Sequence, residues 1–494
     1  MKVQITSERD GVAQPKDWTL TIPRHLADRL LAHLFPGDGD EHGAIVQAGM
    51  VRTPSGTRLL ARDVILALDG VDYVPGQRGY RMLTGKFVTQ QALRCRNEGL
   101  VYLAVHNHSG RDKVAFSEDD LASHRRGYPA LLDVMRGCPV GALVFAENAV
   151  AGQLWLSASE QLQLRVAHVL GPAIRPLYAA PPSPPPGRAA EYDRQARLFG
   201  DRGQDVLRGL TVGVIGAGGA GSLIVEFLAR LGVGRIIVAD PDRIELTNVP
   251  RVTGSVRTDA VPFLTSEGRP EWLRRIGGRF ATPKVRVMER LARRANPRTV
   301  VEAIQGDFVD DHVARRFVQC DFLFLAADTM KARLVFNAIV HGYLIPGVQV
   351  GAKVPVDKAT GIVGDVFTVS RPVWPSRGCL WCNQLITPAG LQQEGETVAE
   401  RRAQRYIDEE QVAAPSVITL NATAAAQAVN DFLFAFTGLT KDDAPLGYWR
   451  LMPRARRVAL DGPRRGDDCP FCSVTAGSAL ARGDQTPLPT RERR

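Results

Sequence analysis

The sequence predicts an α/β protein made of two domains. Strand and helix patterns alternate along both halves of the 494-residue chain, and a proline-rich stretch at residues 171–189 (GPAIRPLYAAPPSPPPGRA) separates the halves. In the second half, a glycine-rich segment at residues 216–222 stands between a strand pattern and a helix pattern, which is typical of a phosphate-binding βαβ unit. We therefore expect a first domain at 1–172, a proline-rich linker at 173–189, a second domain at 190–476 and a disordered tail at 477–494.

The individual elements follow from the periodicity of the apolar residues. In the first half, the pattern predicts a helix at Ile22–Leu34, strands at Gly43–Val51 and Leu100–Val105, and a helix start at Ser117–Arg126. In the second half, it predicts the strand Leu210–Ile215, the helix Ser222–Leu231, the strand Arg235–Ala239, the helix Pro283–Ala295 and the strand Asp321–Ala326. The second half therefore opens with a βαβ unit.

The composition excludes several classes of protein. Hydrophobic residues make up 45% of the chain and charged residues 23%, values typical of a globular protein and not of a disordered, collagen-like or disulfide-dense chain. There is no run of about 18 apolar residues and no apolar signal-peptide core, so we expect a cytoplasmic protein without a membrane span. The net charge of +10 is interspersed and accompanied by no nucleic-acid-binding motif, so we do not expect nucleic acid as a partner.

One predicted strand of the first half ends in two histidines. His106 and His108 alternate along the strand, so both imidazoles point to one side, and neutral imidazoles suit zinc. Asp120 could supply a third ligand and leave the fourth position for water, with Glu41 as the candidate base that takes the water's proton. Simpler interpretations also fit each feature alone, because Ser117 and Asp120 have the spacing of a helix capping box and the histidines could lie in a loop.

Taken together, these residues resemble the motif of the JAB/JAMM (MPN) metallopeptidases, which include deubiquitinases. The resemblance covers residues 20–165 and implies a JAB/MPN-like α/β fold for the first domain. It also implies specific roles: catalytic zinc binding by His106, His108 and Asp120, oxyanion stabilisation by Ser117, and general-base catalysis by Glu41. The chain departs from the family at Ser109, where a proline is frequent, and Asp119 leaves a one-residue ambiguity in the third ligand.

The glycine-rich segment of the second half contains Gly216, Gly218, Gly219 and Gly221. Glycines let a backbone approach a phosphate, and the helix N-terminus that follows favours an anion. Asp240 ends the next strand, where a carboxylate suits ribose hydroxyls, and an NAD dehydrogenase would share these features. The polar residues that surround this unit suit a triphosphate with magnesium better than a hydride donor, although each alone could be ordinary surface charge; they are Arg194, Asn248, Arg251, Lys284, Asp328 and Arg333.

This second set resembles the ThiF/MoeB-like family, the adenylating domain of ubiquitin-activating-type enzymes. The resemblance covers residues 190–475 and implies a Rossmann-like fold that adenylates the C-terminal carboxylate of a protein with ATP and Mg²⁺. It implies an ATP cradle of Gly216, Gly218, Gly219 and Gly221, ribose binding by Asp240, phosphate contacts from Asn248, Arg251 and Lys284, catalysis by Arg251 and Asp328, magnesium binding by Asp328, and a contribution of Arg194 from the partner subunit of a homodimer.

Four of the seven cysteines form two C-x-x-C pairs, Cys379 with Cys382 and Cys469 with Cys472. In a reducing cytosol such pairs indicate a metal before a disulfide, and four thiolates make a closed tetrahedral zinc site. The ThiF/MoeB-like family carries a structural zinc of this kind. Many of its members also form a thioester on a later cysteine, but residues 383–468 contain none, and Cys320 begins a buried-looking strand.

We interpret the chain as two enzymes of a bacterial ubiquitin-like conjugation system in one polypeptide. The first domain would trim or deconjugate a ubiquitin-like protein with a C-terminal glycine, and the second would adenylate the carboxylate that trimming exposes. Covalent linkage would keep both activities at a high effective concentration, and a separate conjugating enzyme is a further expected partner. Two alternatives stay open: activation of a sulfur carrier for thiamine or molybdopterin synthesis, and a non-catalytic scaffold that binds a ubiquitin-like protein.

Overall fold

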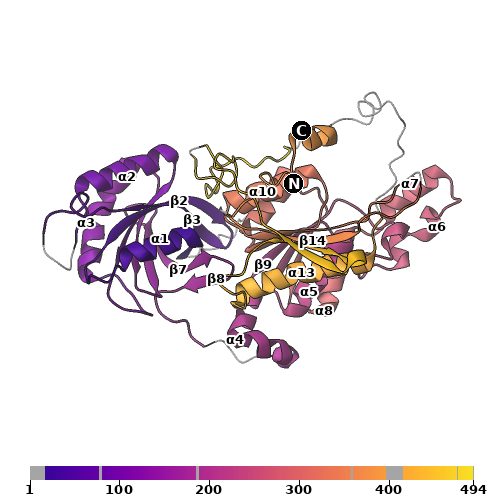
Figure 1. Cartoon of the computed structure of the whole chain (residues 1–494), viewed down its shortest axis with the longest axis horizontal. Helices are drawn as coiled ribbons and strands as arrows, with labels where there is room; N and C mark the ends of the chain where they lie inside the picture. Colours follow the sequence, from indigo (N-terminus) through magenta and orange to yellow (C-terminus); the bar gives the residue numbers. More distant parts are fainter. Residues whose placement is uncertain are drawn as a thin grey trace, which may run out of the picture. The chain divides into compact units, whose positions relative to one another are not determined.

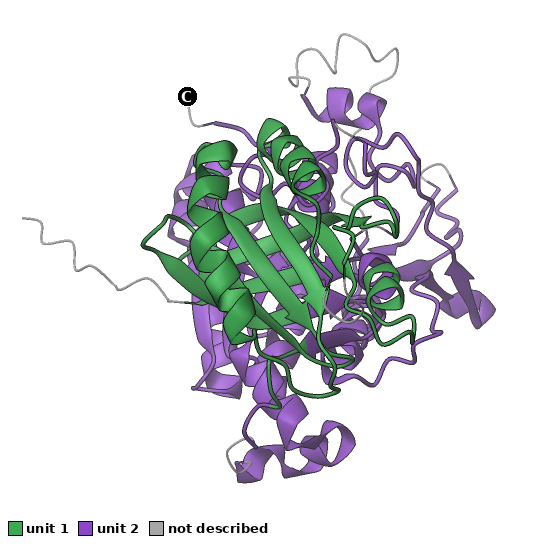
Figure 2. Cartoon of the chain, turned by 90° about the vertical axis from the view of Figure 1, so that its left-hand side faces the viewer, with its two compact units in different colours: residues 1–21, 29–167, 177–181 green, residues 22–28, 168–176, 182–494 purple. Residues whose placement is uncertain are grey.

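The structure is a computed structural model that describes residues 17–76, 81–184, 189–357, 360–375, 377–395, 415–475 and 477–492. The chain divides into two compact units (Figure 2): unit 1 comprises residues 1–21, 29–167 and 177–181, and unit 2 comprises residues 22–28, 168–176 and 182–494. Strands and helices alternate in both units, which confirms the predicted α/β class. The expected first domain, 1–172, was contiguous, whereas the short segments 22–28 and 168–176 belong to unit 2.

The first sheet has eight strands in the order β1-β3-β2-β4-β5-β6-β7-β8, and β1 also pairs with β7. Helices α2 and α3 pack on one face of this sheet around a core that includes Ile45, Tyr102 and Ala142. The elements of this part of the chain are β1 (Asp17–Pro23), α1 (Arg24–Leu34), β2 (Gly43–Thr53), β3 (Gly56–Leu66), α2 (Gly85–Glu98), β4 (Val101–Asn107), α3 (Glu118–Met135), β5 (Val140–Phe145), β6 (Val150–Trp155), β7 (Gln161–Leu170) and β8 (Ile174–Leu177).

The pairing of β2 with β4 positions the candidate metal residues of unit 1. The two strands are antiparallel, in a register that sets Gly43 opposite His106. The segment that leads into β2 therefore lies beside the end of β4, and Glu41 is brought close to the two histidines. Helix α3 begins at Glu118, after the N-cap Ser117, and carries Asp120 in its first turn.

The second sheet also has eight strands, in the order β11-β10-β9-β12-β13-β14-β15-β16. Helices α5, α8 and α13 cover one face of this sheet and α10 covers the other (Figure 1). The elements of unit 2 after β8 are α4 (Asp193–Gly209), β9 (Thr211–Ile215), α5 (Gly219–Leu231), β10 (Arg235–Ala239), α6 (Pro262–Thr265), α7 (Glu271–Phe280), α8 (Lys284–Ala295), β11 (Val300–Ile304), α9 (Asp311–Ala314), β12 (Phe322–Leu325), α10 (Met330–Gly342), β13 (Gly347–Lys353), β14 (Phe367–Val373), α11 (Pro388–Gly395), α13 (Ile418–Thr437), β15 (Tyr448–Met452) and β16 (Arg457–Asp461).

Strand order reverses in the middle of the second sheet. Strands β11, β10, β9, β12 and β13 run parallel to one another, and β9 pairs with β10 on one side and with β12 on the other. The chain leaves β9 toward β10 but reaches β12 only after β11, so a crevice opens at the carboxyl ends of β9 and β12. Ligands bind at this position in open α/β sheets, and the glycine-rich turn after β9 lies there.

Some predicted boundaries shift in the structure. Ile22 and Pro23 end β1 and the helix begins at Arg24, because a proline without an N–H suits the junction between the two elements. Within the expected linker, residues 174–177 form β8, which extends the first sheet. Residues 185–188 of that linker, which include part of the triple proline, lie outside the described residues.

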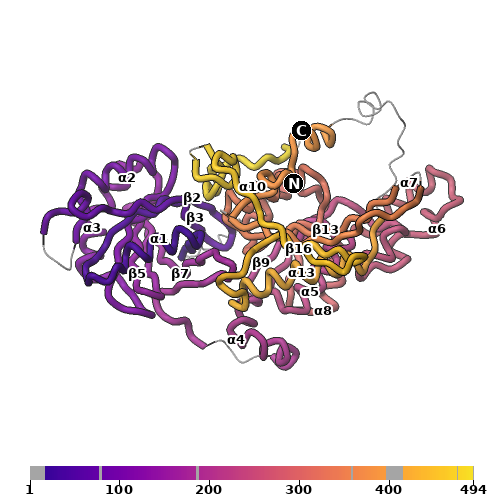
Figure 3. Tube along the Cα trace, in the orientation of Figure 1, coloured from indigo at the N-terminus to yellow at the C-terminus, as the bar shows by residue number. Residues whose placement is uncertain are grey.

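The C-terminal segment differs from the expected disordered tail. Residues 477–492 include a stretch beside α10 (Figure 3), where the Ala481 amide donates to the His341 carbonyl, and residues 493–494 of the expected tail lie outside the described residues. Leu480 and Leu488 are buried, and Arg491 forms an ion pair with Asp310. This order comes from turns and irregular contacts, which leave no periodicity in the sequence. Within the described residues, no helix is long and apolar enough to span a membrane.

Candidate functional site

The predicted metal ligands of unit 1 lie together. The Nε2 atoms of His106 and His108 are 3.2 Å apart, and the Asp120 carboxylate oxygens lie 3.4 Å and 3.3 Å from them. Ligands bound to one tetrahedral zinc at about 2.0–2.1 Å are about 3.3 Å from each other. The three side chains therefore already have the mutual separations of a zinc site with one position left for a further ligand, and all three are partly exposed.

Asp120 takes part in a helix cap as well as in this cluster. The Ser117 amide and hydroxyl both donate to its Oδ2 atom, at 2.8 Å and 2.7 Å, and the Asp120 amide donates to Ser117 Oγ. The capping-box interpretation and the metal interpretation of these residues are thus compatible. Burial raises the pKa of Asp120, but hydrogen bonds from His106 and Ser117 outweigh burial and hold its pKa well below the ordinary range. The carboxylate is therefore ionised and available as a ligand.

Glu41 lies at the edge of the cluster, with its Oε1 atom 3.8 Å from His108 Nε2. Burial raises the pKa of Glu41, and the nearby histidines lower it in part. Two residues that the sequence analysis missed hold this segment in place. Asn107 Oδ1 accepts a hydrogen bond of 2.6 Å from the His42 amide, and Tyr73 Oη accepts one of 2.8 Å from the Gly43 amide. A polar residue between two candidate ligands on a buried strand was the only sequence signal for Asn107.

Unit 2 contains a cavity of about 720 Å³ at the crevice between β9 and β12. Its size falls within the usual range for small-molecule sites, about 300–1,000 Å³. Six of the residues predicted to bind ATP or act on it line this cavity: Gly218, Gly219, Asn248, Arg251, Lys284 and Asp328. They come from the turn after β9, the segment after β10, the start of α8 and the segment after β12, so separate parts of the chain converge on one space.

Three further residues predicted to hold ATP, Gly216, Gly221 and Asp240, shape the glycine-rich turn and do not line the cavity. Gly216 has φ +94°, a left-handed conformation that suits glycine, and a Cβ at Gly221 would stand 1.9 Å from the Gly216 carbonyl oxygen. Asp240 is buried, and its carboxylate accepts hydrogen bonds from the amides of Ala217 and Asp242, at 2.7 Å and 2.9 Å. Asp240 therefore ties the glycine-rich turn to the end of β10.

The position of Lys284 depends on two carboxylates. Its Nζ atom donates to Asp242 Oδ2 at 2.7 Å and lies 3.9 Å from Asp240 Oδ1. Burial raises the pKa of Asp240, and the charge of Lys284 lowers it in part. The lysine is only 12% exposed at its side chain, so the ion pair holds its ammonium group at the cavity. Such a compact cation at the N-terminus of α8 suits a phosphate.

The cavity also has cationic and polar lining that the sequence analysis did not select. Arg371 donates to Gln349 Oε1 at 2.6 Å across the paired strands β13 and β14, and burial lowers the pKa of Arg371 to about 10. Arg333, which the sequence analysis did name, also lines the cavity, and burial lowers its pKa against the opposing charges of Asp328 and Glu394. Lys353 completes this side of the cavity. Gln349 and Arg371 are polar residues within otherwise apolar strands, and this pattern could have identified them. Arg194 is exposed on α4 and lies outside the cavity lining.

The two C-x-x-C pairs also converge. Cys379 Sγ lies 3.5 Å from Cys382 Sγ and 3.6 Å from Cys469 Sγ, and Cys382 Sγ lies 3.7 Å from Cys472 Sγ. Four sulfurs around a zinc ion at about 2.3 Å are about 3.8 Å apart, so the arrangement fits a tetrahedral site. None of the seven cysteines, all of them among the described residues, is joined in a disulfide. Hydrogen bonding between Cys379 and Cys469 lowers the pKa of Cys469 and raises the pKa of Cys379, because the two close thiols share protons.

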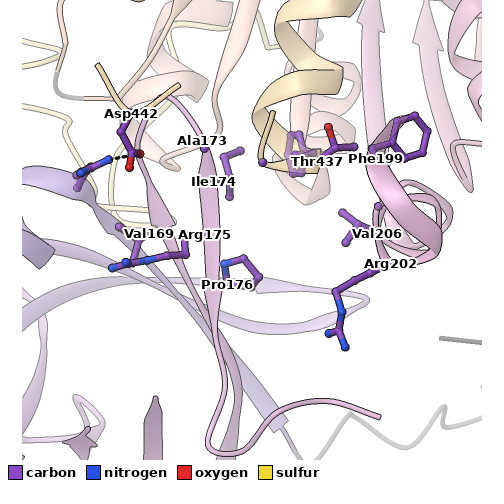
Figure 4. Close-up of a pocket in the computed structure, with 14 residues that line it drawn as sticks. Val169, Ala173, Ile174, Arg175, Pro176, Phe199, Arg202, Val206, Thr437 and Asp442 are labelled. Carbon is purple, nitrogen blue, oxygen red and sulfur yellow. Dashed lines mark hydrogen bonds and ion pairs between the residues drawn. The ribbon is translucent and has the colours of Figure 1, made fainter. Parts of the chain in front are cut away.

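A second cleft of about 400 Å³ lies elsewhere in unit 2 (Figure 4). Its walls include the apolar side chains of Val169, Ile174 and Val206. Asp442 forms an ion pair of 2.7 Å with Arg24, so one of the positive charges in the cleft is already neutralised. The cleft has neither a glycine-rich turn nor a carboxylate free of that pair among its lining residues, and we assign no chemistry to it.

The comparisons with known proteins concern the second part of the chain. Residues 192–448, just over half of the chain, match the ThiF family. The chain is 30% identical over 141 residues to the tRNA threonylcarbamoyladenosine dehydratase of Bacillus subtilis, which covers 28% of this chain and 48% of that protein. It is 26% identical over 182 residues to the SAMP-activating enzyme E1 of Haloferax volcanii, covering 36% and 60%. It is also 26% identical over 298 residues to the sulfur carrier protein ThiS adenylyltransferase of Bacillus subtilis, covering 60% and 75%.

The chain thus spans about half to three quarters of the length of these relatives. The matched region contains the parallel strands β9 to β13, the glycine-rich turn and every residue named above that lines the cavity at the crevice. The sheet order and the position of the turn agree with the Rossmann-like expectation for this half. On the extent of the family match, the chain belongs to the ThiF family.

Proposed function

We propose that this chain is an ATP-dependent adenylyltransferase that activates the C-terminal carboxylate of a ubiquitin-like or sulfur-carrier protein. The observation that carries this proposal is that one cavity gathers six predicted residues in its lining: Gly218, Gly219, Asn248, Arg251, Lys284 and Asp328. Membership of the ThiF family supports it, as do two relatives named for the activation or adenylylation of such carriers. The glycine-rich turn and the cations suit a nucleotide triphosphate.

The proposed reaction follows from where the charges lie. The backbone N–H groups of the turn at the N-terminus of α5 would hold phosphate oxygens, and Arg251 and Lys284 would neutralise the charge that grows as pyrophosphate departs. A carboxylate oxygen of the protein substrate attacks the α-phosphorus, the bond to the β-phosphate oxygen breaks, and the products are an acyl-adenylate and pyrophosphate. Asp328 offers an exposed hard oxygen ligand at the cavity and would hold Mg²⁺, which supplies further charge neutralisation when bound.

We propose that this chain stops at the acyl-adenylate or transfers it directly to a thiol or amine of another protein. Cys320, the remaining candidate in unit 2, is completely buried in the core at the start of the segment that leads into β12. Burial also raises the pKa of Cys95 to about 12, so that thiol is not a nucleophile at neutral pH. A separate conjugating enzyme would then be the acceptor of the acyl group.

We further propose that unit 1 is a zinc peptidase of the JAB/JAMM type. The separations of 3.2–3.4 Å among His106, His108 and Asp120 support it, because they match those of ligands around one zinc ion. Zinc, when bound, supplies a Lewis acid and an activated water. Glu41 would take a proton at its carboxylate, and the Ser117 hydroxyl, which donates to Asp120 Oδ2 in this structure, would turn to donate to the oxyanion. This second activity favours a ubiquitin-like substrate over a sulfur carrier, since the peptidase would then have a substrate to trim or deconjugate.

For the Cys379, Cys382, Cys469 and Cys472 cluster we propose a structural zinc. The four sulfurs close the site and leave no position for water, as structural zinc sites do. This role would join the segment after β14 to the segment after β16, which are far apart in the sequence. Zinc would therefore stabilise unit 2 and take no part in the chemistry.

The adenylation proposal is tested by ATP–pyrophosphate exchange. The full chain is assayed with Mg²⁺ and a ubiquitin-like protein that ends in glycine. Asp328→Ala should lower exchange about 100-fold, because Asp328 would hold the Mg²⁺ that neutralises charge when bound, and Lys284→Ala should lower it about 10-fold or more, because Lys284 would neutralise the departing pyrophosphate directly. Lys441→Ala is the matched control, since Lys441 is exposed and outside the cavity lining. Exchange that is indifferent to both cavity variants would contradict the proposal.

The peptidase proposal is tested with the same ubiquitin-like protein carrying a short extension beyond its terminal glycine. Mass spectrometry should detect removal of the extension by the full chain. Glu41→Gln should slow that cleavage by about 100-fold or more while the zinc content and the pyrophosphate exchange stay unchanged, because Glu41 is proposed as a base and not as a ligand. Equal cleavage by Glu41→Gln would rule out this mechanism.

A further inference from the structure

Helix α7 presents an apolar stripe to solvent. Its members Trp272, Ile276 and Phe280 recur every four residues along the helix, and they are 64%, 42% and 70% exposed. Phe263 on the neighbouring helix α6 is 67% exposed. Four Phe or Trp side chains are exposed in the part of the chain that the structure describes, and three of them belong to α6 and α7. The aromatic exposure of this chain is therefore concentrated on these two helices.

Helices α6 and α7 form a projecting element of unit 2. A Cβ at Gly277 would stand 2.5 Å from the Leu264 Cβ, so the two helices pack closely against each other there. Figure 1 shows both of them projecting beyond the end of the second sheet. Three largely exposed aromatic side chains offer about 300–500 Å² of surface to bury, and exposed apolar patches of a few hundred Å² mark contacts with proteins or membranes.

The exposed charges around the stripe are mostly positive. Between residues 256 and 280, five arginines and two glutamates are exposed, a net charge of +3. Arg275 and Arg279 follow Trp272 and Ile276 by three residues, so both lie on one flank of the stripe. Glu271 and Arg275 form only a loose ion pair of 3.9 Å. The seven exposed charged residues are Arg257, Arg269, Arg274, Arg275, Arg279, Glu267 and Glu271.

We infer that the α7 stripe and Phe263 form a membrane-contact element whose occupant is the surface of a bilayer that contains anionic lipids. An apolar face with Trp and Phe beside a face rich in arginine is typical of helices that lie in the plane of the membrane interface. Arg275 and Arg279 would keep their guanidinium groups among the lipid headgroups, where anionic lipids attract them. Helix α7 has ten residues, fewer than the about 20 that span a bilayer, so it would contact the membrane without crossing it.

The shape of the element favours a bilayer over another macromolecule. A projecting pair of helices can meet a flat lipid surface without a matching contour on the partner. Bases of single-stranded nucleic acid instead stack on aromatic rings that line a basic groove, whereas Trp272 and Phe280 lie on a helix that projects from its unit. This inference concerns where the chain is held and does not depend on the proposed chemistry, so either can fail while the other stands.

Co-sedimentation of the full chain with lipid vesicles tests the inference. The wild type should bind vesicles of phosphatidylcholine that contain about 30% phosphatidylserine, and it should bind pure phosphatidylcholine at least about 10-fold more weakly. Trp272→Ser should weaken binding to the anionic vesicles about 10-fold, because it removes apolar area from the interface. Arg275→Glu combined with Arg279→Glu should also weaken it about 10-fold, because the flank then repels the anionic headgroups.

Two variants are matched controls for these changes. Leu198 on α4 is 61% exposed, and Leu198→Ser removes a similar apolar side chain elsewhere on unit 2. It should leave vesicle binding unchanged. Arg274 lies on the opposite side of α7 from the stripe, so Arg274→Glu should keep binding within about 3-fold of wild type. Circular dichroism and pyrophosphate exchange show for each variant whether the chain is folded and whether unit 2 is otherwise intact.

Tryptophan fluorescence reports the depth of the stripe directly. Trp272 is exposed, whereas the other five tryptophans, all of them described by the structure, are buried or partly buried. Brominated phosphatidylcholine in the anionic vesicles should therefore quench the wild-type emission. Trp272→Phe keeps an aromatic ring at this position, so it should keep vesicle binding within about 3-fold and lose most of the quenching.

Several results would overturn the inference. One is a wild type that does not bind the anionic vesicles, and another is vesicle binding that Trp272→Ser leaves unchanged. Quenching that persists in Trp272→Phe would show that Trp272 does not enter the lipid. A stripe whose variants alter only the mass of the protein in sedimentation velocity, with no effect on vesicle binding, would be a protein contact and not a membrane contact.

Discussion

Single glycines in the glycine-rich turn after β9 are constrained to different degrees. At Gly221 an added Cβ would collide with the Gly216 carbonyl oxygen, whereas at Gly218 it would meet no atom within 4 Å. Gly218 also has a negative φ of −80°, which other residues adopt. The same glycine-rich motif therefore contains one position that the fold requires and one that only the ligand would require.

The two glycines make a matched pair of variants. Gly221→Ala should lower the free energy of unfolding by about 1–3 kcal/mol, because the methyl group forces the turn and α5 apart. Gly218→Ala should leave stability within about 0.5 kcal/mol of wild type and weaken ATP binding, since its methyl group would enter the cavity. Urea unfolding and calorimetric ATP titration check both. Equal stability of the two variants would contradict the constrained turn.

At the scale of elements, one buried ion pair joins the segment before α6 to α8. Asp259 is only 5% exposed, and Arg290 of α8 donates two hydrogen bonds to its carboxylate, at 3.1 Å and 2.6 Å. Burial raises the pKa of Asp259, but the hydrogen bonds from Arg290 outweigh it, so the pKa lies below the ordinary value. The pair therefore links the segment that leads into α6 to the helix that carries Lys284.

This pair gives stability a defined pH dependence. Because the folded carboxyl has the lower pKa, its contribution is fully present above the pKa of the unfolded carboxyl, near 4, and is lost as pH falls through the folded value. Asp259→Asn should lower the free energy of unfolding by about 2 kcal/mol at pH 7, and the difference from wild type should shrink below pH 4. Asp205→Asn, which breaks an exposed pair with Arg208, should cost less than about 0.5 kcal/mol. A pH-independent difference in urea unfolding would contradict this account.

At the scale of the whole molecule, the sequence predicted the features that depend on local periodicity and on motif spacing. The α/β class and the βαβ unit were predictable because each strand and helix carries its own apolar pattern, and the structure gathers the residues around His106 and around Asp328 as their motifs suggested. Arg371 and Gln349 were missed because they enter the cavity only through the pairing of β13 with β14. The order of residues 477–492 was missed because Arg491 and Leu488 pack without a repeat.

The zinc content of this purified chain most directly tests the central proposal, that one ThiF-family chain holds two separate metal sites. The account predicts about two zinc ions, with one lost in His106→Ala and the other lost in Cys469→Ser. His312→Ala and Cys138→Ser, whose side chains lie outside both clusters, should keep both. About one zinc per chain that His106→Ala does not remove would contradict the zinc peptidase assignment of unit 1, and two zinc ions that survive Cys469→Ser would contradict the structural site of unit 2.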